Sequence, residues 1–425
     1  MALTHKIAAN TIYQIAGKAI SMSITILATI IITRTYGRTG YGEFNLMQVW
    51  PALFFIIIDF GLNAIATREL SKNPDDTSLA SKYIGNILLF RIVLSLFFVV
   101  FLSAMLMFFP YSHMLKIGIA INLLQILTQA LYTTLNIVFQ THLRYDYSTI
   151  GYLSGYLLIL LLILVLSFLN APVMLVGFSY VIGGFLTYFI NLKFLHKLNI
   201  FPVLRIDKEV LTYLLIQALP LGLMFIFSQI SFKSDSLLMS VLKLPSQYNL
   251  TNTESIAVYG LAYKIFEVAL VIPTFLMNSV YPILVRHMEE SKEKLKNTFF
   301  KSMAFLLVSG VVFGLVGILF SSVAINFLGG AEFEQSVLVL KILLAGLFLY
   351  YLTQPISWLI VTLGNQRILP IIYLVSAIFN VSANYYFIPR YSFYASSVIT
   401  HISEFIVLVL LAFAAHKTWK AKYAD

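Results

Sequence analysis

The chain has 425 residues, of which 60% are hydrophobic and only 11% are charged, and it contains no cysteine. Its mean hydropathy is +0.88, whereas a soluble domain carries about 25% charged residues. This composition excludes a water-soluble fold and indicates an integral membrane protein. The absence of cysteine excludes disulfides and thiolate metal sites. The net charge of +10 comes from basic residues scattered between apolar runs, which favours membrane topology over nucleic-acid binding.

Apolar runs long enough to cross a bilayer, about 17–25 residues, recur twelve times along the chain. They cover residues 10–33, 44–66, 83–109, 117–139, 149–169, 172–192, 213–243, 257–284, 300–321, 336–362, 368–388 and 394–416. The runs are too long for barrel strands and lack strict alternation of apolar and polar residues. The sequence therefore predicts an all-α polytopic membrane protein with twelve transmembrane helices.

The basic residues of the loops predict the orientation of these helices. If the N-terminus is cytoplasmic and the helices alternate, five of the 28 lysines and arginines lie inside the spans and five on the outer side. The remaining eighteen lie on the cytoplasmic side. Such a bias indicates that both termini are cytoplasmic. The N-terminal segment MALTHKIAANTIYQ has no small-residue cleavage site, so we expect the first helix to be retained rather than removed as a signal peptide.

A long basic loop near the middle of the chain divides the predicted helices six and six. We therefore expect an N-terminal lobe over 1–198 and a C-terminal lobe over 199–425, with a cytoplasmic linker near 193–209. A shift of 218 residues places Tyr41-Gly42 on Tyr259-Gly260 and Arg68 on Arg286. This match predicts two repeats of six helices, related by an axis along the membrane normal.

Three ionisable residues of the first half lie within predicted spans, and each is expensive there unless it is paired or hydrated. Lys18, Asp59 and Arg91 fall on three successive helices. At a rise of about 1.5 Å per residue, all three come to a similar depth below the cytoplasmic boundary. We expect Asp59 to be met by Arg91 or by Lys18. A structural ion pair and a substrate-binding cation are both open at this point.

The second half carries a further set of ionisable residues inside its spans, closer to the outer side: Lys233, Asp235, Lys264, Glu267, His401 and Glu404. Lys264 and Glu267 are three residues apart and share one helical face. His401 and Glu404 have the same spacing and form either a proton relay or a hydrogen-bonded packing pair. Together with the charges of the first half, they predict a polar, hydrated cavity between the two lobes.

Motifs for catalysis are missing from the sequence. There is no P-loop, no HExxH motif, no GxSxG motif with partners, and no large outer loop that could carry catalytic carboxylates. We therefore expect a protein that is not an enzyme and that holds no cofactor and no resident metal.

One stretch of the first half resembles a known family. The segment IIITRTYGRTGYGEFNLMQVWPALFFIIIDFGLNAIATRELS is similar to the opening of the polysaccharide-biosynthesis flippases of the multidrug/oligosaccharidyl-lipid/polysaccharide exporter superfamily. The matching residues are Arg34, Tyr41-Gly42 with Phe44, Asp59-Gly61-Leu62 and Arg68-Glu69. The segment around Asp235 and Tyr259-Gly260 resembles the seventh and eighth helices of these proteins. Twelve helices favour the Wzx-type flippases of O-antigen and capsule repeat units over the lipid II flippases.

The resemblance implies a fold and a transport activity. It implies two six-helix lobes arranged as a V, alternating access, and a polyprenyl-pyrophosphate-linked oligosaccharide as substrate, driven by a gradient of H+ or Na+. The pyrophosphate needs cations, and the available ones are Lys18, Arg91, Lys233 and Lys264. The acids that would pair with them or couple ions are Asp59, Asp235, Glu267 and Glu404, together with His401. These four cations and four carboxylates sum to zero, so a binding cation has to be one that is not already paired.

The resemblance also implies a setting for the protein. We expect a multi-pass protein of the bacterial inner membrane that is monomeric, with the lipid bilayer and the polysaccharide polymerase machinery as candidate partners. A multidrug or organic-cation antiporter of the same superfamily is the main alternative, and it would need an acidic, cation-accepting cavity. A membrane glycosyltransferase or polymerase is a third hypothesis.

Overall fold

The structure is a computed structural model that describes the backbone of residues 2–423 and the side chains of residues 13–423. Within that range every regular element is a helix and no strand is formed. Ten helical stretches are long and apolar enough to cross a membrane. The predicted all-α membrane fold is therefore confirmed.

Two of these ten stretches are much longer than one membrane crossing requires. Tyr13–Asp59 has 47 residues and Gln366–Tyr423 has 58, whereas about 20 helical residues span the hydrocarbon core. Each contains one residue with a non-helical backbone, Gly37 (φ 62°) and Ser392 (φ 49°), at which two helices meet in a kink. Twelve spans require both stretches to cross twice, and the count of twelve stays a prediction.

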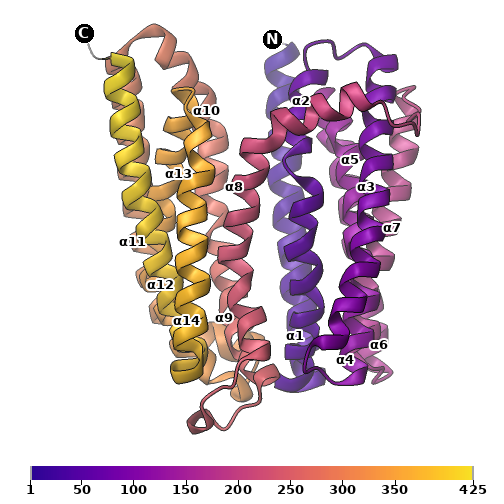
Figure 1. The fold of residues 1–425 in the computed structure, drawn as a ribbon, viewed down its shortest axis with the longest axis vertical. Coiled ribbons are helices and arrows are strands. Elements are labelled where there is room, and N and C mark those ends of the chain that lie inside the picture. The colour runs from indigo at the N-terminus through magenta and orange to yellow at the C-terminus, as the bar shows by residue number, and fades with distance from the viewer. Residues whose placement is uncertain (1, 424–425) are drawn as a thin grey trace. The chain divides into compact units, whose positions relative to one another are not determined.

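The chain divides into two compact units, Met1–Ile226 and Phe227–Asp425, and the long helices of each unit lie side by side (Figure 1). Unit 1 contains α1 (Ala2–Asp59), α2 (Leu62–Leu70), α3 (Thr77–Met105), α4 (His113–Asn122), α5 (Leu124–Thr141), α6 (Tyr145–Phe168), α7 (Val173–Lys197) and the first part of α8 (Lys208–Val241). Unit 2 contains the rest of α8, α9 (Asn252–Ala269), α10 (Val271–Glu290), α11 (Lys292–Leu328), α12 (Gln335–Ala345), α13 (Leu347–Thr362) and α14 (Leu369–Tyr423). Short 3-10 turns cover Leu106–Phe108, Ser246–Tyr248, Ala331–Phe333 and Gln366–Ile368.

The division between the units falls inside α8, later than the lobe boundary expected at residue 198. The reason is packing. Leu214 and Ala218 of α8 are fully buried in an apolar core that also contains Leu62 of α2, Ile84 of α3 and Leu135 of α5. The first turns of α8 are thus part of unit 1, although they follow the linker in sequence.

The linker between α7 and α8 is fixed to the start of α3. The backbone N–H of Val203 donates to the carbonyl of Ser81 at 3.2 Å, and a Cβ on Gly85 would lie 1.9 Å from the Val203 carbonyl oxygen. Only glycine allows the linker to approach so closely. Asp207 pairs with Lys82 at 2.6 Å, and the hydrogen bond from Lys82 holds the pKa of the Asp207 carboxyl below its ordinary value.

Several membrane-length stretches are broken into two helices. In α9–α10 the break at Leu270 precedes Pro273, whose ring removes the hydrogen bond to the carbonyl four residues earlier. That carbonyl belongs to Ala269, and it accepts a hydrogen bond from the Tyr351 hydroxyl at 2.8 Å. In unit 1, the stretch that follows α3 consists of two helices, α4 and α5. In unit 2, the stretch that follows α11 likewise consists of two helices, α12 and α13. This order agrees with the predicted repeat.

Candidate functional site

The fully buried Arg91 and the partly buried Asp59 form an ion pair at a helix break. α1 ends at Asp59, and the chain passes through Phe60 and Gly61 with positive φ before α2 begins. The Arg91 guanidinium of α3 donates to the Asp59 carboxylate at 2.8 Å and to its backbone carbonyl at 3.1 Å. Its other amino group donates to Asn63 at 2.9 Å and to Thr134 at 2.7 Å. Arg91 therefore satisfies both the carboxylate and a carbonyl that the end of α1 leaves without a helical partner.

This geometry decides which of the two cations meets Asp59. The Arg91 side chain is 0% exposed and that of Asp59 is 14% exposed, so the pair is shielded from water. Lys18 is exposed and forms no ion pair with any side chain of residues 13–423. In this structure Arg91 is committed to Asp59, and Lys18 is the cation of the first half that is left over.

In unit 2, two lysines converge on one carboxylate. Lys233 of α8 donates to Glu267 of α9 at 2.7 Å, and Lys264 lies 3.9 Å from the other oxygen of Glu267, as its position one helical turn away predicts. The side chains of Lys233, Lys264 and Glu267 are 21%, 39% and 35% exposed. All three groups can be reached by solvent. We call Lys233, Lys264 and Glu267 the lysine pair cluster.

Asp235 lies on α8 near the lysine pair cluster but is held by a different set of contacts. It is 1% exposed and accepts hydrogen bonds from the Tyr259 hydroxyl and from the backbone N–H of Ser236. The Tyr259 hydroxyl also lies 3.5 Å from Thr400 of α14. Asp235 is therefore satisfied by neutral donors and forms no direct ion pair with a described side chain.

Glu404 of α14 faces a small polar cavity in the same unit. Its carboxylate accepts a hydrogen bond from Thr353 of α13 at 2.5 Å. The cavity has a volume of about 20 Å³ and is lined by Ser228, Ser231, Phe232, Tyr350, Tyr373, Ser376, Asn380, Thr400, Ser403, Glu404 and Val407. A volume of this size holds about one water molecule. Thr400 connects this cavity to Tyr259 and thus to Asp235.

His401 and Glu404 do not form the hydrogen-bonded pair that their spacing suggested. His401 Nε2 lies 2.7 Å from the carbonyl of Ile342, while Glu404 bonds to Thr353. His401 Nδ1 is buried without a hydrogen-bond partner among the described residues. The two residues share a helical face, but each is held by a different neighbouring helix.

Unit 1 contains a second polar cavity, of about 50 Å³. Tyrosine and glutamine side chains form most of its wall: Gln125, Gln129, Tyr132, Tyr152, Tyr156 and Tyr180. The hydroxyls of Tyr152 and Tyr156 are hydrogen-bonded at 2.9 Å. The cavity has room for one or two water molecules, and it is too small for a sugar in this conformation.

Some polar residues of these sites were not singled out in the sequence. Asn63 and Thr134 complete the shell of Arg91, and Asn380 joins Ser234 at 3.2 Å and Ser403 at 3.0 Å. The sequence does contain a pattern that indicates this contact. Asn380 and Asn384 lie four residues apart in an apolar helix, and amides at this spacing typically form hydrogen bonds to neighbouring helices. Among residues 2–423 no group of three or more His, Asp or Glu side chains could hold a metal ion.

Comparisons with known proteins assign the sequence to a family. The family described as polysaccharide biosynthesis protein matches residues 7–288, and the MatE family matches residues 220–386. No match was found among the curated proteins.

Solved structures with a similar fold are transporters. An inward-facing multidrug resistance MATE family transporter of the MOP superfamily has a TM-score of 0.77 at 12% identity, covering 95% of this chain and 96% of that one. The lipid II flippase MurJ in an inward closed conformation has a TM-score of 0.74 at 16% identity, covering 96% and 89%. A MOP superfamily transporter from Pyrococcus furiosus, described as having a binding pocket of reverse polarity, has a TM-score of 0.69 at 14% identity, covering 97% and 96%.

The solved structures named above are described as transporters or as a flippase. The polysaccharide biosynthesis family covers about two thirds of the sequence. The chain therefore belongs to the polysaccharide biosynthesis protein family and has the fold of the MOP-superfamily transporters.

Proposed function

We propose that this protein flips a polyprenyl-pyrophosphate-linked oligosaccharide across the bacterial inner membrane by ion-coupled alternating access. Membership of the polysaccharide biosynthesis family over residues 7–288 supports a glycan as cargo. The similarity of the fold to a lipid II flippase supports a lipid-linked form of that glycan. O-antigen and capsule repeat units are the substrates we propose within this class.

The observation that carries the proposal is that Lys233 and Lys264 meet at one carboxylate, Glu267, within reach of solvent. A pyrophosphate binds through charge-assisted hydrogen bonds to cations that solvent can reach. Lys233 and Lys264 share a single carboxylate and keep 21% and 39% of their side chains exposed. A phosphate oxygen could replace one Glu267 contact without leaving a buried charge unpaired. Among the predicted cations, these two fit the pyrophosphate best.

We propose different roles for the two cations of the first half, Lys18 and Arg91. Lys18 is exposed and stays a candidate cation for the substrate. Arg91 is fully buried in its pair with Asp59, so it could contact substrate only if that pair opened. We assign Arg91 a positioning role at the α1–α2 break.

The coupling ion is proposed to bind at Asp235 and Glu404. Both carboxyls lie inside the fold with hydroxyl donors, and neither forms an ion pair with a described side chain. A carboxylate held at such a place by neutral donors is costly and favours uptake of a proton or a small cation. Thr400 lines the same small cavity as Glu404 and lies 3.5 Å from the Tyr259 hydroxyl, which donates to Asp235. His401 would assist through its unpartnered Nδ1.

The setting follows from the same proposal. The charge bias of the loops supports cytoplasmic N- and C-termini. The protein would act as a monomer, and the polysaccharide polymerase machinery would receive its product on the outer side of the membrane.

A multidrug or organic-cation antiporter is the second candidate. The MatE match over residues 220–386 and the similar MATE structures favour it, and so do the buried carboxyls Asp235 and Glu404. The two candidates differ at the lysine pair cluster, because a cationic drug would be repelled by Lys233 and Lys264.

Deletion of the gene tests the proposed cargo directly. We expect cytoplasm-facing lipid-linked glycan to accumulate in the deletion strain and to disappear when the wild-type chain is supplied. The measurement is lipid extraction and mass spectrometry of the polyprenyl-linked glycans, with surface polysaccharide followed in parallel. Unchanged glycan levels in the deletion strain, together with increased sensitivity to cationic drugs, would replace the flippase by the antiporter.

The double variant Lys233→Ala/Lys264→Ala tests the cation assignment. Each charge-assisted hydrogen bond contributes about 1.5–3 kcal/mol, so we expect flipping in reconstituted liposomes to fall by on the order of 10- to 100-fold. Lys341→Gln is the matched control, because Lys341 is an exposed cation of α12 in the same unit. Full activity of the double variant would refute the assignment, and a gain in export of cationic drugs would support the antiporter.

A further inference from the structure

A cleft of about 390 Å³ lies within unit 2 between α11, α13 and α14. Each helix contributes one face. Lys292, Lys296, Phe299, Phe300 and Met303 recur along α11 at helical spacing, and Ala412, Ala415, His416 and Trp419 do so along α14. Ile356 and Leu359 of α13 form the floor between them. The volume is in the range of sites that bind small ligands, about 300–1,000 Å³.

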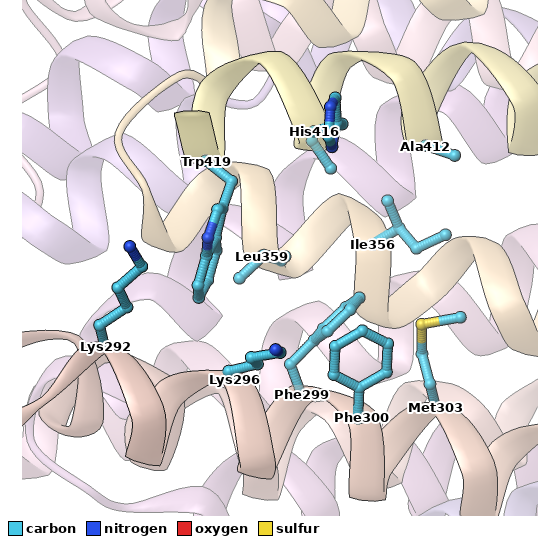
Figure 2. Close-up of a pocket in the computed structure, with 11 residues that line it drawn as sticks. Lys292, Lys296, Phe299, Phe300, Met303, Ile356, Leu359, Ala412, His416 and Trp419 are labelled. Carbon is cyan, nitrogen blue, oxygen red and sulfur yellow. The ribbon is translucent and has the colours of Figure 1, made fainter. Parts of the chain in front are cut away.

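The polarity of the cleft changes from one end to the other. Figure 2 shows Lys292 and Trp419 at one end and Met303 and Ala412 at the other, with the Phe299 and Phe300 rings between. From Lys292 to Met303 the α11 axis rises about 16 Å. The end of the cleft at Lys292, which we call its mouth, is positively charged and lies beside the α10–α11 junction and the end of α14. The opposite end is apolar.

The mouth is built for an anion. None of the residues that line the cleft is acidic. Of the acids close to Lys292 in sequence, Glu290 is already paired with Arg286 and Lys294, at 2.8 Å each, and Glu293 does not line the cleft. Lys292 is kept at the mouth by the carbonyl of Tyr423 at 3.3 Å and by the Tyr423 ring.

We propose that this cleft binds one anionic phospholipid, with the phosphate at Lys292 and Lys296 and an acyl chain along Phe300, Met303 and Ala412. None of the residues that line the cleft belongs to the lysine pair cluster, and the site does not depend on the proposed function. A tryptophan at the boundary between head group and hydrocarbon is typical of membrane proteins. A free phosphate would leave the apolar end of the cleft unused, and a zwitterionic lipid would bring a positive group as well as a phosphate to its two lysines.

The test titrates the purified full-length protein with phosphatidylglycerol or phosphatidylcholine in detergent and counts bound lipid by native mass spectrometry. A lysine near an anionic lipid contributes about fivefold in affinity, so Lys292→Gln/Lys296→Gln should weaken phosphatidylglycerol binding by about 30-fold. Ala412→Phe fills the apolar end and should weaken the binding of this lipid while both lysines remain. Lys301→Gln/Lys417→Gln removes two exposed lysines of the same helices outside the cleft and should bind like wild type.

Three results would overturn the proposal. The first is equal affinity of the wild type for phosphatidylglycerol and phosphatidylcholine. The second is unchanged binding by both cleft variants, and the third is equal weakening by the cleft and control lysine variants. Competition by inorganic phosphate as strong as by phosphatidylglycerol would identify a simple anion site instead. Elution volume and melting temperature without added lipid show that each variant is folded.

Discussion

Arg91→Ala is expected to lower the free energy of unfolding by about 3–5 kcal/mol, because it leaves the buried Asp59 carboxylate without its cation. The loss is large because one guanidinium makes four hydrogen bonds, to the Asp59 carboxylate, the Asp59 carbonyl, Asn63 and Thr134. Arg91→Lys should recover only part of the stability, since an ammonium cannot reproduce the planar fork of donors. Unfolding by sodium dodecyl sulfate in mixed micelles measures the difference.

A double variant that removes both Asp59 and Arg91 shows whether the ion pair is needed only for stability or also for transport. Asp59→Leu/Arg91→Met replaces the pair by apolar side chains and should regain most of the stability, because neither charge is then left alone. If the stable double variant also flips substrate, the pair only holds the α1–α2 break together. If it is stable but inactive, one of the two charges acts in transport.

An exposed ion pair provides the control for this series. Arg68 pairs with Glu69 at 2.8 Å, and its side chain is 53% exposed. Arg68→Ala should cost about 1 kcal/mol or less, because solvent screens such pairs. A loss at Arg91 no larger than that at Arg68 would show that the break in α1–α2 does not depend on the buried pair.

The sequence predicted those parts of the fold that depend on local composition. Membrane-length apolar runs gave the helices, and the depth of Asp59 and Arg91 on neighbouring helices indicated their contact. The i, i+3 spacing placed Lys264 beside Glu267, as observed at 3.9 Å. These features follow from helical periodicity and need no knowledge of packing.

Contacts between distant helices could not be predicted in the same way. Lys233 of α8 reaches Glu267 of α9 across two different helices, and His401 turns to Ile342 instead of Glu404 because α12 supplies a carbonyl there. The positive φ at Gly37 and Ser392 likewise joins helices by kinks, where the sequence pattern indicated short loops. The cleft between α11, α13 and α14 is lined by residues that lie more than a hundred positions apart in the sequence, from Lys292 to Trp419.

Asp235→Asn and Glu404→Gln are expected to abolish the stimulation of flipping by an ion gradient while leaving the protein folded. Each amide keeps the size of the acid, so the contacts with Tyr259 and Thr353 can be retained. What is lost is the ability to gain and release a proton, or to offer a full negative charge to a cation. Ionic hydrogen bonds contribute about 1.5–3 kcal/mol, which corresponds to a fall of about 10- to 100-fold in the stimulated rate.

The measurement uses liposomes that contain the purified protein and a fluorescent lipid-linked oligosaccharide, with either a pH gradient or a Na+ gradient imposed. The gradient that accelerates the wild type identifies the coupling ion, and the two variants should flip at the same slow rate with and without it. Glu334→Gln, at an exposed acid that precedes α12, should respond like wild type. A variant at Asp235 or Glu404 that keeps the full response is not the coupling residue. If both keep it, ion coupling lies outside Asp235 and Glu404, the two acids of unit 2 that we propose as its sites.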